Sequence, residues 1–172
     1  PSSGKTEIFL HLILDTLRAG RQALYLLPEI ALTTQMTERL ADVLGPRLLV
    51  YHSGLTDRER AEVWRRLLRT ESEPAVVVGV RSSLFLPFDR LGLIVVDEEH
   101  EPSYKQNDPA PRYHARNAAL MLARMHGARA LLGSATPSLE TYYLARTGRY
   151  GLVTLTERYG AAPEPEIVLV DT

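Results

Sequence analysis

Short aliphatic runs alternate with helix-like stretches along most of the chain, and this alternation constrains its fold more than any other feature. Ala75–Val80 and Leu93–Val96 are nearly continuous β-branched and aliphatic runs, typical of strands covered on both faces. Shorter runs stand at 23–27, 48–51 and 130–132, and the stretches between them carry apolar residues at helical spacing. The pattern predicts βαβ crossovers, and hence an α/β fold with a mostly parallel sheet and helices on both faces.

Helices are expected between and after these strands. They cover residues 6–17, 33–44, 57–69, 113–126 and 137–147. Thr56, with Glu59 three residues later, has the spacing of a capping box at the start of the third helix. Thr136 and Pro137 suit the N-cap and the first helical position of the last helix. Trp64, on the third helix, is expected to pack in the core.

The composition excludes several classes of protein. With 172 residues, 45% of them hydrophobic and 24% charged, the chain suits about one globular domain. Cysteine is absent, which excludes disulfides, thiolate zinc sites and a cysteine nucleophile. No apolar run is long enough to span a membrane. A net charge of -1 argues against a chain that coats nucleic acid by bulk electrostatics alone.

The chain opens on Pro-Ser-Ser-Gly-Lys-Thr, without an initiator methionine or a signal-like segment. A P-loop has the pattern Gly, four residues, Gly-Lys, then Ser or Thr, and residues 4–6 fill its last three positions. We therefore expect a piece of a larger protein that begins inside a phosphate-binding loop at Ser2 and Ser3. The first strand of its sheet would then lie before Pro1.

The residue types of this loop suit a nucleoside triphosphate. Backbone N–H groups at a helix N-terminus favour phosphate, and Gly4 lets the backbone come close. Lys5 is expected to bridge the β- and γ-phosphates, and the Thr6 hydroxyl to ligate Mg²⁺. Taken alone, the half-motif equally suits a Ser/Gly turn that caps a helix.

A second element decides between these interpretations. The run 93–96 ends in Asp97, Glu98, Glu99 and His100, which places the acids at the carboxyl edge of a parallel sheet, where ligands bind. Asp97 is expected to hold Mg²⁺, and Glu98 to orient or deprotonate the attacking water. An acidic strand end alone is typical of a solvated turn. Together with Gly-Lys-Thr it predicts a nucleoside triphosphate site.

A third element, residues 133–137, is another junction between a strand and a helix. The hydroxyls of Ser134 and Thr136 would face the same sheet edge as Asp97. The Asp-Glu-Glu-His and Ser-Ala-Thr sequences at 97–100 and 134–136 together resemble motifs II and III of superfamily 2 helicases.

Longer phrases narrow the resemblance to the replication-restart helicases of that superfamily. They are residues 26–33, 51–55, 79–82, 97–106 and 133–140, with Glu59, Arg60, Trp64, Phe85, Pro87 and Phe88 between them. The similarity runs from Pro1 to Thr172 and includes the uncommon Ser-Tyr-Lys-Gln phrase at 103–106. It implies a RecA-like P-loop NTPase lobe at residues 1–160, the first of two. Residues 161–172 would be a linker toward the second RecA-like lobe, which would supply an arginine finger.

The same resemblance implies a function. The implied function is that of a DNA-dependent ATPase, which moves 3′→5′ on single-stranded DNA and assembles the primosome at stalled forks. The implied cofactors are ATP and Mg²⁺, with no zinc in this chain. The implied partners are single-stranded and forked DNA, the second lobe, and primosome and single-strand-binding proteins, with no membrane. The implied location is the bacterial cytoplasm, at the nucleoid.

The resemblance also implies which residues contact DNA and which couple DNA binding to ATP hydrolysis. The DNA-contact candidates are Thr33, Arg81, Ser82, Tyr104, Lys105, Tyr113 and His114, and the coupling candidates are His100, Ser134 and Thr136. Tyr104 and Tyr113 belong to a loop whose rings could stack on bases without sequence preference, and the lesser alternative is that both rings simply pack on the domain surface. Arg81 could contact a DNA phosphate or remain solvated.

Two other functions compete with the motor. One is a fork-binding scaffold for primosome assembly with dispensable or lost ATPase activity, because Ser2 stands where the family has glycine and its Cβ could crowd the phosphates. The other is a different superfamily 2 translocase, such as the motor subunit of a restriction enzyme. The Ser-Tyr-Lys-Gln and Gly-Val-Arg-Ser phrases argue against that second alternative.

Overall fold

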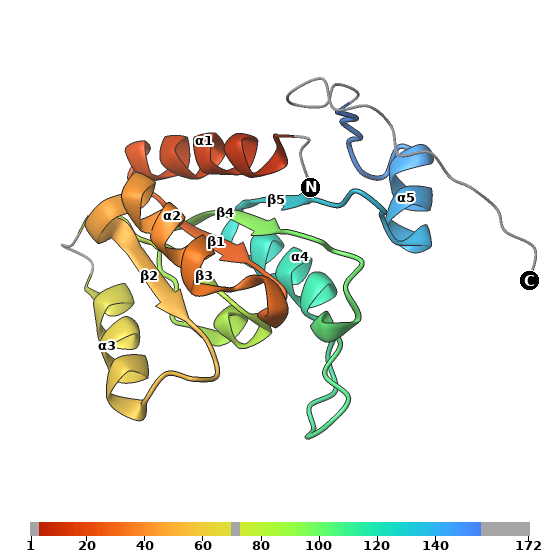
Figure 1. The fold of residues 1–172 in the computed structure, drawn as a ribbon. Helices are drawn as coiled ribbons and strands as arrows, with labels where there is room; N and C mark the ends of the chain where they lie inside the picture. Colours follow the sequence, from red (N-terminus) through yellow and green to blue (C-terminus); the bar gives the residue numbers. More distant parts are fainter. Residues whose placement is uncertain (1–3, 70–72, 156–172) are drawn as a thin grey trace, which may run out of the picture.

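The structure, a computed structural model, describes residues 4–69 and 73–155, and within them a parallel sheet lies between helices (Figure 1). The strands are β1 (Gln22–Leu26), β2 (Leu48–Tyr51), β3 (Val76–Gly79), β4 (Leu91–Val96) and β5 (Arg129–Leu132). The α-helices are α1 (Lys5–Arg18), α2 (Thr34–Leu44), α3 (Asp57–Leu68), α4 (Ala115–His126) and α5 (Leu139–Arg146). Short 3-10 turns are η1 (Glu29–Ala31), η2 (Gly45–Arg47), η3 (Arg81–Phe85) and η4 (Pro102–Tyr104).

Each strand and helix expected from the sequence forms, with ends that shift by no more than two residues. No helix in the described part of the chain is long and apolar enough to cross a membrane. Ser2, Ser3 and the expected linker at 161–172 lie outside the described residues.

The five strands are parallel and stand in the order β2-β3-β1-β4-β5. The register pairs Leu26, at the end of β1, with Gly79 on β3 and with Val96 on β4. Because parallel strands point the same way, the residues that follow them meet along one edge of the sheet. The α/β fold with a mostly parallel sheet is therefore confirmed.

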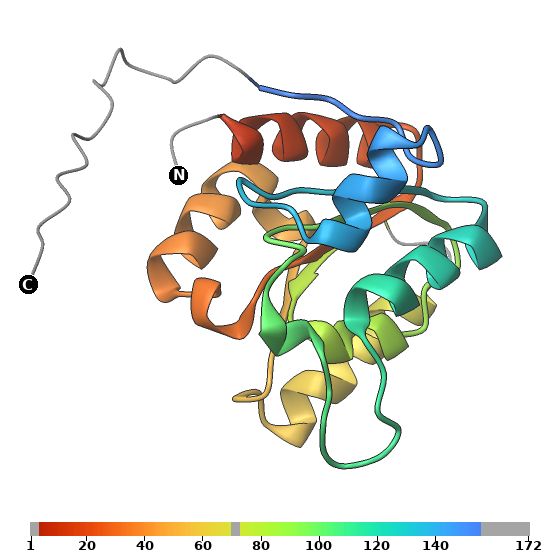
Figure 2. The ribbon, with the colours of Figure 1, turned by 90° about the vertical axis from the view of Figure 1, so that its right-hand side faces the viewer.

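Alternate residues of the central strands enter two separate cores. On one face, Leu24 and Ile94 join buried residues of α3 and α4, such as Leu67 and Ala119. On the other face, Tyr25 and Val95 join buried residues of α1 and α2, a group that includes Ile13 and Leu40. Helices thus cover both faces, as the continuous apolar strands predict, and the two views agree on this layering (Figures 1 and 2).

The helix starts test the capping predictions. The capping box of Thr56 and Glu59 is confirmed, with both reciprocal hydrogen bonds present. The prediction for the last helix is wrong, because Ser138 rather than Thr136 is the N-cap of α5. The Ser138 hydroxyl accepts from the backbone N–H of Thr141 at 3.3 Å, whereas the N–H of Thr136 donates to Ser134 Oγ at 3.0 Å and stays in the preceding turn.

The prediction that Trp64 packs in the core is also wrong. Val63 and Leu67 point into the core from α3, and Trp64 lies about 100° around the helix from Val63, so it remains 46% exposed.

Gly79 permits a close approach between β3 and the end of β2. A Cβ there would lie 2.4 Å from the backbone carbonyl oxygen of Tyr51 and 2.1 Å from Ser83 Oγ.

We expect Gly79→Ala to lower the free energy of unfolding by about 2 kcal/mol, because the Tyr51 carbonyl cannot move aside without shifting the strand. The matched control is Gly151→Ala, where a Cβ meets nothing within 4 Å. Denaturant titration measures both, and equal stability of the two variants would contradict the expectation.

Candidate functional site

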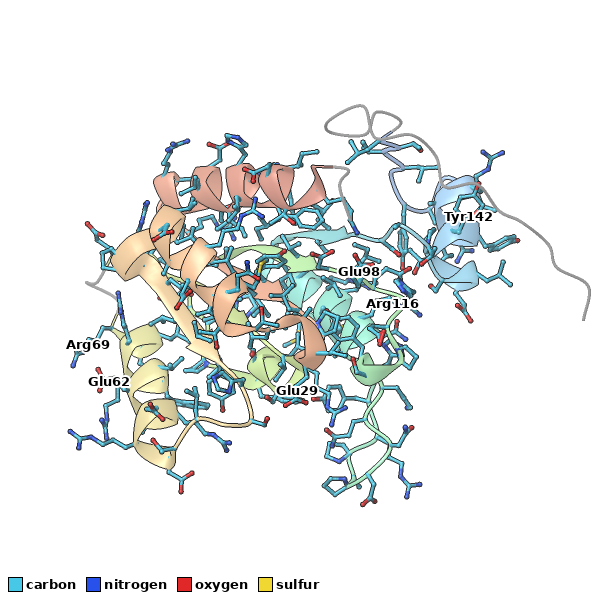
Figure 3. All side chains as sticks on the ribbon, in the orientation of Figure 1. Glu29, Glu62, Arg69, Glu98, Arg116 and Tyr142 are labelled. Atoms are coloured by element: carbon cyan, nitrogen blue, oxygen red, sulfur yellow. The ribbon has the colours of Figure 1, made fainter. Side chains whose placement is uncertain are left out.

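Three residues expected to act on a nucleotide lie together at the carboxyl edge of the sheet. Lys5, the first residue of α1, donates from Nζ to Glu98 Oε1 at 2.6 Å, and the same nitrogen lies 3.6 Å from Asp97 Oδ1. Asp97 and Glu98 directly follow β4. Figure 3 shows Glu98 between this end of the sheet and α5. The structure therefore brings Lys5 into one site with two acids that stand more than ninety positions further along the chain.

The start of α1 has the geometry of an anion site. Gly4 is its N-cap, with φ of 72° and no side-chain cap. A residue with a Cβ adopts this left-handed conformation only under strain, so glycine suits the position. The N–H groups of the first helical turn then have no capping side chain, and their partial positive charge favours phosphate. Gly4, Lys5 and Thr6 can thus bind a phosphate through the backbone as well as through the lysine.

Tyr25, a buried residue of β1, organises the metal-binding candidates. Its hydroxyl donates to Asp97 Oδ2 at 3.0 Å, and the Thr6 side chain lies near the same hydroxyl. Burial, reinforced by the Asp97 carboxylate, raises the pKa of Tyr25 far above its usual value, so the phenol stays protonated. Burial also raises the pKa of Asp97, although Lys5 and Tyr25 oppose that shift.

The two expected Mg²⁺ ligands, Thr6 and Asp97, share Tyr25 as a neighbour. A hydroxyl and a carboxylate oxygen are ligands that fit Mg²⁺, which keeps several of its waters and takes further oxygens from bound phosphates. Within residues 4–69 and 73–155, no group of three or more His, Cys, Asp or Glu residues could hold a metal ion alone.

The expected coupling residues also meet. His100 Nδ1 lies 2.7 Å from Ser134 Oγ, and the other ring nitrogen lies 3.4 Å from Thr136 Oγ1. Nδ1 is also 3.7 Å from Glu98 Oε2. The imidazole thus connects the acidic turn after β4 to the turn after β5.

Tyr104 corrects a prediction. Its side chain is 0% exposed, so its ring offers no surface on which a base could stack. The hydroxyl instead donates to the backbone carbonyls of Asp97 at 2.7 Å and of Leu26 at 3.1 Å. These carbonyls stand at the carboxyl ends of neighbouring strands, so the Tyr104 hydroxyl joins the ends of β1 and β4 beside the acids.

A hollow lies at the same edge, beyond the ends of β1, β2 and β3. It has a volume of about 530 Å³, and its polar lining includes Glu29, His52, Arg60, Arg81 and Ser82. Arg81 donates to the carbonyl of Ser103 at 2.9 Å, and Arg60 donates to that of Ser53 at 2.6 Å. Two guanidinium groups beside an open hollow favour a phosphodiester chain, although the Glu29 carboxylate in the same lining opposes it.

The DNA-contact candidates divide into two groups. Arg81 and Ser82 line this hollow, with the buried Tyr104 beneath its surface, whereas Thr33, Lys105, Tyr113 and His114 do not line it. Thr33 caps α2 by accepting from the N–H of Met36 at 3.2 Å. Tyr113 packs edge-to-face on Phe85, with ring centroids 5.1 Å apart. Burial lowers the pKa of His114, aided by Arg116. Lys105 and His114 pair at the base of a loop that extends away from the sheet (Figures 1 and 2).

Sequence reasoning assigned no role to Glu99, which is 1% exposed. Arg116 donates to its Oε2 at 2.8 Å, and the backbone N–H of Ser138 donates to its Oε1 at 2.6 Å. Thr141 Oγ1 donates to Oε2 at 2.9 Å. Burial raises the pKa of Glu99, but these hydrogen bonds outweigh it and hold that pKa below its usual value.

Other residues of the two sites were also missed. Tyr25 is the one hydroxyl-bearing residue in an otherwise aliphatic run at 23–27, which is the only signal that it serves a polar group. Arg60 lines the hollow, but it stands among many other charged residues of its helix, so the sequence does not distinguish it as a binding residue. Arg116 stands in the first turn of an alanine-rich helix, where a cation is unfavourable, and that conflict is a usable signal.

Comparisons with known proteins agree with this geometry. The model of the DEAD/DEAH box helicase family matches residues 1–144. The chain is 47% identical over 169 residues to the replication restart protein PriA of Bacillus subtilis (strain 168), which covers 98% of this chain and 21% of that protein. It is also 47% identical to the PriA of Rickettsia prowazekii (strain Madrid E), over 98% of this chain and 26% of that protein. It thus spans about a quarter or less of their length.

A solved structure shows the same fold. The crystal structure of the DUF1998 helicase MrfA superposes with a TM-score of 0.56 at 20% identity, over 85% of this chain and 25% of that chain. At that identity the likeness shows the fold alone.

Glu99 makes the folding free energy dependent on pH. Its lowered pKa in the folded state means that its stabilisation is complete above the unfolded pKa of about 4.3 and is lost as the pH falls through the folded pKa. We expect Glu99→Gln to cost about 3 kcal/mol at pH 7, because the largely buried guanidinium of Arg116 would lose its counter-charge. We expect its unfolding free energy to fall less steeply below about pH 5 than that of the parent.

The matched control is Glu140→Gln, at an exposed acid of α5. Denaturant unfolding at several pH values measures all three proteins. A parental pH slope that persists in Glu99→Gln would contradict the assignment.

Proposed function

The chain belongs to the DEAD/DEAH box helicase family, and on that premise we propose that residues 1–160 form the ATP-binding lobe of a DNA helicase that restarts stalled replication forks. The observation that carries the proposal is the convergence of Lys5 Nζ on Glu98, at 2.6 Å, and on Asp97, at 3.6 Å. It joins a phosphate-binding residue to two carboxylates at the sheet edge. The name of the relatives, replication restart protein PriA, supports the biological role.

In the proposed mechanism, the first turn of α1 and Lys5 bind the triphosphate of ATP. Lys5 must then leave Glu98, because its ammonium group cannot pair fully with both the carboxylate and the phosphates. Thr6 and Asp97 would hold Mg²⁺, which supplies positive charge to the phosphates. Tyr25 donates to one oxygen of Asp97 and so fixes the orientation of the carboxylate that would hold the metal. Glu98, released from Lys5, orients the attacking water and accepts its proton.

The coupling proposal uses His100, Ser134 and Thr136. His100 contacts both hydroxyls and lies near Glu98, so a displacement of the turn after β5 changes the surroundings of the acid. In the proposed motor, this connection links DNA movement to hydrolysis.

A second RecA-like lobe, reached through the linker at 161–172, would close over the nucleotide and supply an arginine finger. The proposed partners are single-stranded and forked DNA, together with primosome and single-strand-binding proteins. The proposed motor moves 3′→5′ in the bacterial cytoplasm, at the nucleoid, and uses ATP with Mg²⁺.

The proposed DNA path passes the hollow lined by Arg60 and Arg81. Arg81 and Ser82 would contact the phosphate backbone there, and Arg60 and His52 join them as candidates from the lining. Thr33, Lys105, Tyr113 and His114 remain outer candidates along the same path. Tyr104 takes a supporting role beneath them, because its ring is buried.

The ATP assignment is tested by Lys5→Ala in the full-length helicase. We expect DNA-stimulated ATP turnover to fall at least about 100-fold, because Lys5 is the cation proposed to stabilise the transferring phosphate. The control is His11→Ala, at an exposed position on the same helix, which should keep parental turnover. Undiminished turnover in Lys5→Ala would refute the assignment. A parental protein that binds forked DNA without turnover would instead favour the scaffold function.

The DNA path is tested by Arg60→Gln and Arg81→Gln, each measured for binding to single-stranded DNA over a range of salt concentrations. We expect weaker binding, and a log–log salt slope that is smaller by about 0.7 for each DNA phosphate that the variant no longer neutralises. Arg65→Gln is the control, because Arg65 is an exposed arginine on the same helix as Arg60. Slopes equal to that of the control would contradict this path.

A further inference from the structure

The turn that carries Glu98 is under backbone strain. Glu98 has φ of 46°, the only positive value among the non-glycine residues that the structure describes. A side chain in this left-handed region is disfavoured, so the surrounding contacts must impose it. On one side, the Glu98 N–H donates to Asp97 Oδ1 at 2.9 Å. On the other side, the Glu99 N–H donates to the carbonyl of Gly133 at 3.0 Å.

The Glu99 side chain fastens this turn to two helices. Its carboxylate accepts from Ser138 and Thr141 at the start of α5, and from Arg116 in the first turn of α4. Arg116 also donates to Ser138 Oγ at 2.5 Å, which closes the network. With Glu99 1% exposed and the Arg116 side chain 12% exposed, solvent screens this pair little.

The positions of the two charges favour a role for the pair. The Glu99 carboxylate lies at the N-terminus of α5, where an anion is favoured. Arg116 lies at the N-terminus of α4, where a cation is disfavoured. Helix stability alone therefore does not explain an arginine at position 116, whereas pairing with Glu99 does. Figure 3 labels both Glu98 and Arg116 in the region between the end of the sheet and α5.

We propose that Glu99, together with Arg116, is a positioning residue for ATP hydrolysis: the pair fixes the strained turn so that the Glu98 carboxylate points into the nucleotide site. This inference rests on the proposed ATPase function. Glu99 points away from Lys5, toward α4 and α5, and contacts neither phosphate nor water in this role. It acts through the backbone of Glu98.

Catalysis and nucleotide binding depend on different residues in this proposal. Lys5 and the first turn of α1 bind the phosphates, whereas the Glu99 carboxylate is engaged by Arg116, Ser138 and Thr141. Loosening the turn should therefore lower kcat for ATP and leave KM nearly unchanged. A role limited to holding α5 in place would change the stability of the protein but leave kcat per nucleotide-binding site as it is in the parent.

The experiment uses the full-length helicase with single-stranded DNA, with rates divided by the concentration of ADP-binding sites. We expect Glu99→Gln and Arg116→Gln each to lower kcat about tenfold, with KM for ATP within about twofold of the parent. The double variant carries two neutral amides that can hydrogen-bond to each other. We expect it to recover to within about threefold of the parental kcat, because no buried charge is left unpaired.

Thr141→Val removes a single hydroxyl from the network and keeps the proposal testable if the charge variants do not fold. We expect it to lower kcat about threefold. The controls are Glu140→Gln on α5 and Arg124→Gln on α4, both at exposed positions, which should leave kcat unchanged.

Three outcomes would overturn the inference. They are site-normalised kcat values at the parental level in the single variants, losses that multiply in the double variant, and a parental kcat in Thr141→Val. A parental protein without ATP turnover overturns the proposed function instead, and this result is distinct from the other three.

Discussion

The parallel pairing of β1 with β4 is the constraint on which the site depends. It places Leu26 opposite Val96, so Asp97 emerges beside the end of β1, where its N–H donates to the Leu26 carbonyl at 3.0 Å. From there the carboxylate reaches both Tyr25 on β1 and Lys5 on α1. A shift of one residue would turn every side chain of β4 to the other face, and the acid would leave the proposed nucleotide site.

Asp97 is the point at which several polar contacts meet in a largely apolar interior. Its carboxylate accepts from Tyr25 and from the Glu98 N–H, and its backbone carbonyl accepts from Tyr104. Tyr104 begins the segment that leads to the projecting loop, so the sheet edge and that loop share a hydrogen-bonded base. Buried polar groups of this kind are stable only when each one has a partner, and these contacts supply one for each of them.

Periodicity and local motifs predicted most of the fold and the core of the site. The apolar runs predicted the strands, and the Gly-Lys-Thr and acidic motifs predicted which ends would converge. The failures were of another kind. Trp64 and Tyr104 are both aromatic, yet one is exposed and the other buried, because burial depends on which helical face or strand end meets the core. Contacts between distant segments, such as Tyr25 with Asp97 and Arg116 with Glu99, leave only faint local signals.

The central claim is that Lys5, Thr6 and Asp97 form one magnesium–triphosphate site. The most direct measurement is a crystal structure of the full-length protein with Mg²⁺ and a non-hydrolysable ATP analogue. We expect Lys5 Nζ to have left Glu98 for the phosphates, with the metal between Thr6 and Asp97. A nucleotide bound elsewhere, with the 2.6 Å contact between Lys5 and Glu98 intact, would contradict the claim.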